Sequence, residues 1–304
     1  MALSFLKIIF FMFAGWAFAH RDRYREQTSS FLNKYLYYLG LPAIIIHKVS
    51  LLDATSLSGA FLAVNTIPII AVSIILFIFW KVSILSVNQT RTLLIVSVLG
   101  NTVYLGLPAV AAFLGEEYIG YAALVSAAHN LVIFTFCLII MNLISEDKFA
   151  FSSFIKHTVK NPVLDSSFLG LGLAFLSIRP SGFPAAILSE ISATVIPLSL
   201  IALGFSLYGR MRFMGRIKLL SLAAALKLIV LPFLSAFLIY ITQGLEPAFK
   251  VSFIQHTMPT AVMAYIVAKE MELDDELTSQ TIVFTTLIYF LLIPVYNVVM
   301  KLLF

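Results

Sequence analysis

Long apolar runs separated by short polar gaps dominate the pattern of hydrophobic and polar positions along the chain. A helix that crosses a bilayer needs about 20 mostly apolar residues. Runs of this length predict ten spanning helices, at residues 2–19, 30–48, 59–80, 91–113, 119–142, 162–179, 186–208, 217–241, 248–268 and 278–301. The pattern therefore predicts an all-α integral membrane protein.

The composition excludes an ordinary water-soluble domain. The 304 residues are 61% hydrophobic and 12% charged, whereas soluble domains are close to half apolar and a quarter charged. A formal net charge of +5 would suggest a nucleic-acid partner, but the basic residues lie in the gaps between apolar runs, as membrane topology requires. We therefore expect no nucleic-acid partner. The single cysteine, Cys137, excludes an internal disulfide and indicates no metal site.

The first apolar run resembles a signal peptide, because it ends in Ala17-Phe18-Ala19. Against cleavage, Lys7 lies inside the run and no basic cluster precedes it. We expect an uncleaved first helix.

Lys and Arg are distributed unequally between the two sides of the predicted spans. One side holds five, and the side that follows odd-numbered spans holds 14: Arg21, Arg23, Arg25, Lys34, Lys81, Arg91, Lys148, Lys156, Lys160, Arg210, Arg212, Arg216, Lys218 and Lys269. Cytoplasmic loops carry the excess of basic residues. We therefore expect a multi-pass protein of the cell (inner) membrane with both termini on the extracytoplasmic side.

Proline and glycine interrupt the spans in an order that recurs in the two halves. The matching stretches are Gly40-Leu41-Pro42 with Ile196-Pro197, Asn65 and Pro68 with Lys227 and Pro232, and Gly100–Pro108 with Gln255–Pro259. Five spans per half make the halves enter the membrane in opposite directions, as in many secondary transporters. The alternative is that proline merely occurs in spans by chance. We predict two inverted five-helix repeats, at 1–142 and 162–304, joined by a cytoplasmic loop at 143–161.

The fourth and ninth spans are predicted to be broken. Pro108 and Pro259 would each stand at the first position of a new half-helix, since that position needs no N–H donor. The freed N–H groups and the positive dipole end would attract a carboxylate or phosphate. The alternative for either helix is a proline kink without a ligand.

Two sets of residues follow as candidates for the site. The substrate-binding set is Asn101, Thr102, Gly106, Pro108, Gln255, His256, Pro259 and Thr260; the set for ion coupling or charge tuning is Lys227, Asn65, His129, Asn130 and Asp165. Lys227 lies too deep in its span to reach the interface easily.

Each candidate also has a structural interpretation. Asn101 could cap its own helix, and a buried histidine often only packs and hydrogen-bonds. Asn65 could face a cavity or a neighbouring helix. Asp165 could pair with Lys227, carry coupling protons, or lie in the cytoplasmic interface.

Several phrases together resemble the auxin efflux carrier family in its short bacterial form. They are Gly100-Asn101-Thr102-Val103-Tyr104-Leu105-Gly106-Leu107-Pro108, Asn161-Pro162, Ile196–Gly204, Leu226-Lys227-Leu228 with Pro232, Met258–Glu270 and Thr285–Pro294. The resemblance implies crossed, unwound fourth and ninth helices, elevator-like movement, frequent dimers, and transport of indole-acetate or of dicarboxylates such as malate. It places Asn101 and Pro108 on the first crossover motif and Pro259 on the second.

The chain departs from plant carriers of that family in two respects. The long cytoplasmic loop is absent, and Asn65-Thr66 stands where an aspartate would precede the threonine. The second departure puts a plant-like proton or cation site in doubt.

The sequence thus predicts a secondary active permease for a small organic anion, with no cofactor and with H⁺ or Na⁺ as an open choice of coupling ion. The alternatives are a sodium-coupled symporter of the bile acid type and a membrane receptor that binds a ligand without moving it. No arrangement of residues typical of an enzyme is evident.

Overall fold

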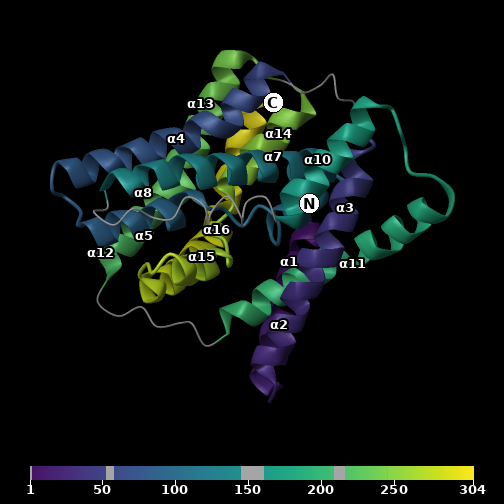
Figure 1. Cartoon of the computed structure of the whole chain (residues 1–304), viewed down its shortest axis with the longest axis horizontal. Coiled ribbons are helices and arrows are strands. Elements are labelled where there is room, and N and C mark those ends of the chain that lie inside the picture. The colour runs from purple at the N-terminus through teal and green to yellow at the C-terminus, as the bar shows by residue number, and fades with distance from the viewer. Residues whose placement is uncertain (1, 53–57, 145–160, 209–215, 245) are drawn as a thin grey trace. The chain divides into compact units, whose positions relative to one another are not determined.

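The computed structural model describes residues 2–52, 58–144, 161–208, 216–244 and 246–304 (Figure 1). Within these ranges the regular elements are helices, and one isolated bridge joins two unwound segments. Most of the predicted loop at 143–161 lies outside the described residues. The same holds for Lys148, Lys156, Lys160, Arg210 and Arg212.

The helices follow one another in short steps along the chain. They are α1 (Ala2–Arg21), α2 (Arg25–Tyr35), η1 (Leu36–Gly40), α3 (Leu41–Val49), α4 (Gly59–Lys81), α5 (Val87–Val98), α6 (Gly106–Phe113), η3 (Glu116–Tyr118), α7 (Ile119–Val132), η4 (Ile133–Cys137), α8 (Leu138–Ile144), α10 (Pro162–Phe175), α11 (Gly182–Leu207), α12 (Ile217–Ala225), η5 (Leu226–Val230), α13 (Leu231–Thr242), α14 (Pro247–Thr257), α15 (Ala264–Glu270) and α16 (Asp275–Leu303). Elements η1, η4 and η5 are π-helical turns, and η3 is a 3₁₀ turn.

Among the described residues, five continuous helices are long and apolar enough to cross a membrane: Gly59–Lys81, Glu116–Ile144, Gly182–Leu207, Ile217–Thr242 and Asp275–Leu303. Each of the five coincides with a predicted span, so a long apolar helix at each of these five positions is confirmed. The first predicted span coincides with the continuous 20-residue helix α1, and the other predicted spans fall on helices that are shorter or interrupted. The arrangement of ten spans as an inverted repeat stays a prediction.

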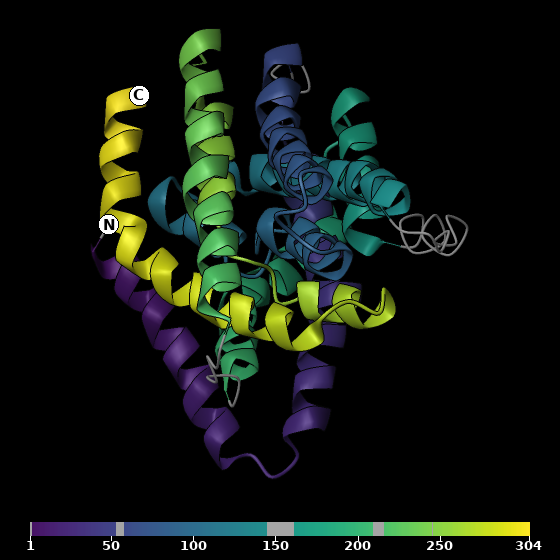
Figure 2. The ribbon, with the colours of Figure 1, turned by 90° about the vertical axis from the view of Figure 1, so that its left-hand side faces the viewer.

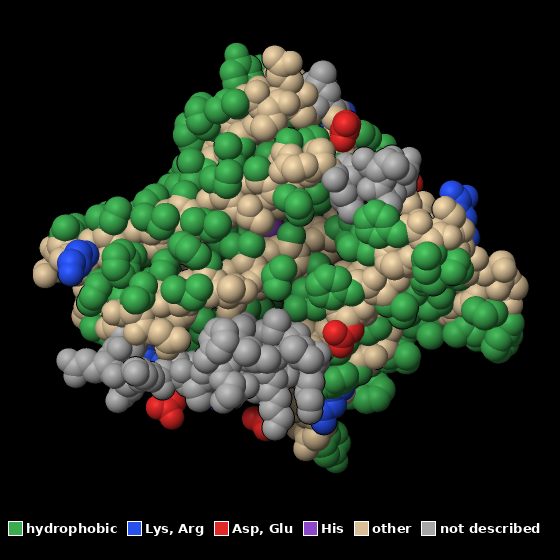
Figure 3. Space-filling view, turned by 45° about the horizontal axis from the view of Figure 1, so that its top comes forward, with side chains coloured by type: hydrophobic (Ala, Val, Ile, Leu, Met, Phe, Trp, Pro, Cys, Tyr) green, Lys and Arg blue, Asp and Glu red, His purple; other side chains and the backbone are tan. Residues whose placement is uncertain are grey.

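Apolar side chains are exposed in stripes, as lipid-facing helices require. On α13 and the turn before it, Ile229, Phe233, Phe237 and Tyr240 are all exposed at helical spacing. Figure 3 shows hydrophobic side chains covering much of one face, with few charged side chains among them. Polar residues such as Lys227 are buried instead. This distribution fits a bilayer and would be costly in water.

The chain forms two compact units, and each unit draws on both halves of the sequence. The first unit comprises residues 1–57, 103–127 and 155–209, and the second comprises 58–102, 128–154 and 210–304. The first and second predicted spans of each half therefore belong to the first unit. Most of the third, fourth and fifth predicted spans of each half belong to the second unit, apart from α6 and the first part of α7.

Helices α1 and α11 of the first unit approach each other closely. A Cβ atom at Gly15 would collide with the Ile201 carbonyl oxygen, and one at Gly204 would collide with the Met12 carbonyl oxygen. Glycine at both positions therefore allows backbone-to-backbone contact, which is how membrane helices commonly pack. Helix α3 packs against α10 and α11 in the same unit.

We expect Gly204→Ala to destabilise this helix pair. The added methyl meets a backbone atom that cannot move aside, and such overpacking typically costs about 1–3 kcal/mol. The melting temperature in detergent should fall, while Gly172→Ala, a matched control in α10 with open space around it, should not lower it. Equal melting temperatures for the two variants would contradict the close contact.

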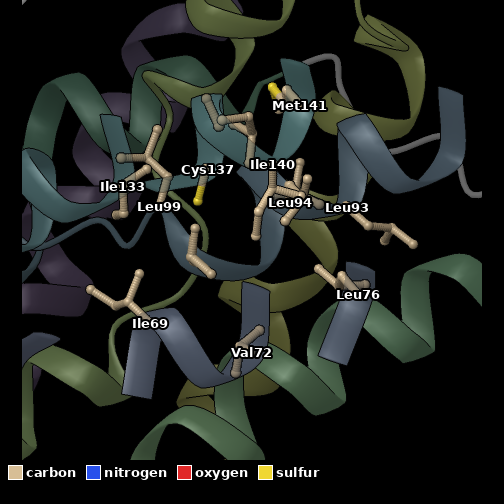
Figure 4. Close-up of a cluster of buried hydrophobic side chains, with 14 of the residues drawn as sticks. Ile69, Val72, Leu76, Leu93, Leu94, Leu99, Ile133, Cys137, Ile140 and Met141 are labelled. Carbon is tan, nitrogen blue, oxygen red and sulfur yellow. The ribbon is translucent and has the colours of Figure 1, made fainter. Parts of the chain in front are cut away.

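The second unit has an apolar core between α4, α5, η4 and α8. Figure 4 shows Ile69, Val72 and Leu76 of α4 facing Leu93 and Leu94 of α5, with side chains of η4 and α8 closing the cluster. All of these side chains are buried. The core fixes the end of α5, from which the candidate site begins.

Prolines matched between the halves differ in local geometry. Turns η1 and η5 directly precede Leu41-Pro42 and Leu231-Pro232, and in each the leucine N–H reaches a carbonyl five residues back. Proline lacks an N–H and crowds the preceding turn, which favours such widening. Pro68 and Pro197 lie inside continuous α-helices. The long helix α16, which contains Pro294, is visibly bent in Figure 2.

Candidate functional site

Two unwound segments cross inside the second unit, one after α5 and one after α14. Gly100 and Thr260 form an antiparallel bridge. The Asn101 N–H donates to the Pro259 carbonyl at 2.7 Å, and the Ala261 N–H donates to the Leu99 carbonyl at 2.8 Å. Unwound backbone at membrane depth persists only where partners satisfy it, and here the two segments satisfy each other. We call residues 99–101 and 259–261 the crossover.

The prediction that Pro259 begins a half-helix is wrong. Helix α14 ends at Thr257, α15 begins only at Ala264, and the Pro259 carbonyl is used in the crossover. Several N–H groups after Pro259 already have partners: those of Thr260, Ala261, Ala264, Tyr265 and Ile266. These five backbone groups are therefore occupied and are not available to a ligand. In the first unit, Pro108 does lie in the first turn of α6.

Thr260 is a structural residue of the crossover. Its hydroxyl donates to the Val96 carbonyl at 2.7 Å, a group left free where α5 ends. Its N–H donates to the Thr285 hydroxyl oxygen at 3.1 Å. The sequence interpretation missed Thr285, although Thr278, Thr281, Thr285 and Thr286 form a buried polar stripe within an apolar span. That stripe was the available signal.

Lys227 lies fully inside the second unit with its amino group against the crossover. Its side chain is 1% exposed, and a Cβ atom built on Gly100 would lie 2.9 Å from the lysine Nζ. Among the described residues no carboxylate forms an ion pair with it. A buried positive charge without a protein partner is costly, so this group is suited to an anion that arrives from outside.

Asn101, the residue after Gly100 in the crossover, carries a second side-chain donor. The residue is 4% exposed, and its Nδ2 group has no hydrogen-bond partner among the described residues. An unsatisfied buried donor costs about 1–3 kcal/mol, which a ligand oxygen would recover. Thr102 beside it is also buried.

Two histidines stack within the second unit. The ring centroids of His129 and His256 are 4.4 Å apart, and both side chains are buried. His256 Nε2 donates to the Val64 carbonyl at 3.0 Å, because a carbonyl oxygen can only accept. His129 Nε2 has no partner in the described part of the chain. Both rings interact electrostatically with Lys227.

Asn65 faces a neighbouring helix, which resolves the two interpretations of this residue. Its Nδ2 group donates to the Phe61 carbonyl at 2.8 Å and to the Ser252 hydroxyl at 2.9 Å, tying α4 to α14. Its Oδ1 atom has no partner among the described residues. Asn65 is therefore a bridge between helices with one acceptor left over.

The remaining candidates contribute less to this cluster. Gln255 is buried on α14, and Asn130 is half-buried on α7. Gly106, Pro108 and Asp165 belong to the first unit. Asp165 is exposed in the first turn of α10, where the helix dipole favours a carboxylate, and its predicted roles stay predictions.

The cluster offers amine, amide and imidazole groups and no set of metal ligands. No group of three or more His, Cys, Asp or Glu side chains in the described ranges could hold a metal ion. What remains at the crossover is one amine and one amide donor. This chemistry is suited to a small anion.

Comparison with known proteins gives one family. The model of a family described as "Membrane transport protein" matches residues 2–297. An uncharacterized transporter of Methanothermobacter thermautotrophicus is 24% identical over 282 residues, and an uncharacterized transporter of Methanocaldococcus jannaschii is 28% identical over 283 residues. Each alignment covers 90% of both chains. The chain therefore belongs to this family of membrane transport proteins, the auxin efflux carrier family.

Proposed function

We propose that the protein is a secondary active permease that carries a small organic anion, a mono- or dicarboxylate, through the cell inner membrane. The observation that carries the proposal is the presence of two buried donors at the crossover: the amide of Asn101, which has no partner among the described residues, and the amine of Lys227, which lies against Gly100. A carboxylate would accept from the amide and neutralise the ammonium in one step.

The division into two units supports an elevator-type mechanism. The crossover belongs to the second unit, together with Lys227 and both histidines. In the proposed cycle this unit carries the anion across the membrane while the first unit acts as the scaffold. Because each unit takes corresponding spans from both halves, the division also fits two inverted repeats. We also propose that both termini lie on the extracytoplasmic side of the membrane and that the protein forms a homodimer.

Uptake into proteoliposomes tests the proposal. Purified protein would be reconstituted, and uptake of radiolabelled malate, malonate, succinate, lactate and indole-acetate would be measured with and without proton and sodium gradients. We expect saturable uptake of at least one acid, absent from protein-free liposomes. The gradient that drives uptake identifies the coupling ion, and sodium dependence would favour the symporter alternative. Binding of an acid without uptake would favour a receptor.

We expect Gly100→Ala to weaken transport by displacing Lys227. The added methyl lies 2.9 Å from Nζ, so the amino group must move away from the crossover. The KM for the acid carried best should rise about tenfold, equivalent to about 1.4 kcal/mol of lost binding. Gly59→Ala in α4, where a Cβ atom meets open space, is the matched control and should leave KM unchanged. An unaltered KM in Gly100→Ala would show that Lys227 is not part of the anion site.

A further inference from the structure

Pro232 leaves one carbonyl beside Lys227 without its usual donor. In an α-helix the N–H of residue 232 would donate to the carbonyl of Leu228, but proline has no N–H. The hydroxyl of Tyr296, on α16, donates to this carbonyl at 2.7 Å. A side chain from another helix thus replaces the missing backbone donor.

A side chain also replaces a missing backbone donor in α4, which contains Pro68. Pro68 removes the donor for the Val64 carbonyl, which accepts from His256 Nε2 instead. In both cases the capped carbonyl lies directly next to a buried polar residue, Asn65 in one helix and Lys227 in the other. The two side-chain bonds therefore hold the stretches of backbone that carry Asn65 and Lys227, which proline leaves without a backbone hydrogen bond.

The Tyr296 ring is itself held in place. It lies edge-on to Phe253, with ring centroids 6.5 Å apart, and its centroid is 6.1 Å from that of Tyr289. The hydroxyl is thus presented to the Leu228 carbonyl by a packed ring. Leu228 and Lys227 are neighbours within the turn η5, so the bond fixes the turn that carries the lysine.

We propose that Tyr296 is a positioning residue for Lys227. Its hydrogen bond to the Leu228 carbonyl holds η5 so that the lysine amino group stays against Gly100 at the crossover. Without the hydroxyl, the turn relaxes and the amino group moves away from the crossover. The consequence for transport rests on the proposed function, whereas the positioning itself does not.

Thermal unfolding tests the positioning without any substrate. Tyr296→Phe, Gly100→Ala and the double variant would be compared with the wild type in detergent. Both single changes should lower the melting temperature. In the double variant the fall should be smaller than the sum, because a released turn lets the amino group avoid the new methyl. Tyr289→Phe is the matched control, because it removes a hydroxyl from the neighbouring buried tyrosine and leaves the bond from Tyr296 to Leu228 in place, and its effect should add to that of Gly100→Ala.

Restoring the backbone donor gives the second arm. In uptake assays with the acid from the panel carried best, Tyr296→Phe should raise KM about fivefold, the equivalent of one hydrogen bond, with Vmax nearly unchanged. Pro232→Ala restores an N–H at the position from which an α-helix donates to the Leu228 carbonyl, so Tyr296→Phe should have no effect on KM in that background. A merely structural tyrosine would lower the amount of folded protein and leave KM unchanged.

Additive melting temperatures for Tyr296→Phe and Gly100→Ala would overturn the proposal. So would a KM effect of Tyr296→Phe that persists in Pro232→Ala. If the wild type carries none of the acids, the proposed function fails, and the unfolding comparison still decides whether Tyr296 positions Lys227.

Discussion

Lys227→Met should abolish anion uptake while leaving the protein folded. Methionine has a similar length and volume but no charge, so the packing around η5 is retained. Removing one partner of a buried charge pair typically costs 2–5 kcal/mol of binding, and we therefore expect at least about a 30-fold loss in uptake rate at low substrate concentration. Initial rates in proteoliposomes would measure it.

The same variant should be as stable as the wild type or more stable. Among the described residues Lys227 has no carboxylate partner, so its buried charge destabilises the folded state. Lys250→Met is the matched control, because Lys250 lies on α14 with its amine over the Phe304 ring and away from the crossover. A Lys227→Met protein that transports normally would show that the lysine plays no part in binding the anion. One that fails to fold would assign it a structural role.

Uninterrupted spans could be predicted from the sequence because lipid imposes one simple rule on each of them. The run predicted at 59–80 became α4 (Gly59–Lys81), and the run at 217–241 became the continuous helix Ile217–Thr242. The break after Val98 was also predictable, because glycine and proline cluster there. These signals are local, so a single stretch of sequence contains them.

Partners across the crossover could not be predicted, because they lie far apart in the chain. The bond from the Ala261 N–H to the Leu99 carbonyl consumes a backbone donor that the sequence interpretation assigned to the ligand. Thr285 was missed for a similar reason. Its hydroxyl donates to the Thr281 carbonyl, as threonine does in many helices, and only the fold brings the Thr260 N–H to it. Buried polar positions were recognised, but their roles depended on tertiary contacts.

The two intramembrane asparagines illustrate this difference. Asn65 and Asn101 are equally polar and both buried, and the sequence suggested a functional role for each. The fold gives the Asn65 amide two acceptors and gives the Asn101 amide none among the described residues. A satisfied donor stabilises the folded protein, whereas an unsatisfied one costs stability until a ligand accepts from it.

Asn101→Ala should therefore lose transport without losing stability. Its backbone N–H keeps the bond to Pro259, and only the amide without a partner disappears. A hydrogen bond to a charged group is worth about 1.5–3 kcal/mol, so the KM for the acid carried best should rise about 10- to 100-fold. The melting temperature should stay at the wild-type value or increase. Uptake kinetics and thermal unfolding on the same preparation would measure both.

Asn65→Ala is the matched contrast and should behave in the opposite way. It removes the hydrogen bond from α4 to Ser252 on α14, so the melting temperature should fall below that of the wild type. Asn101→Asp gives a further check, since a carboxylate of the same size repels an anionic substrate and should transport even less than alanine. If Asn101→Ala instead unfolds the protein, or Asn101→Asp transports normally, the amide at the crossover only supports the fold and the anion binds elsewhere.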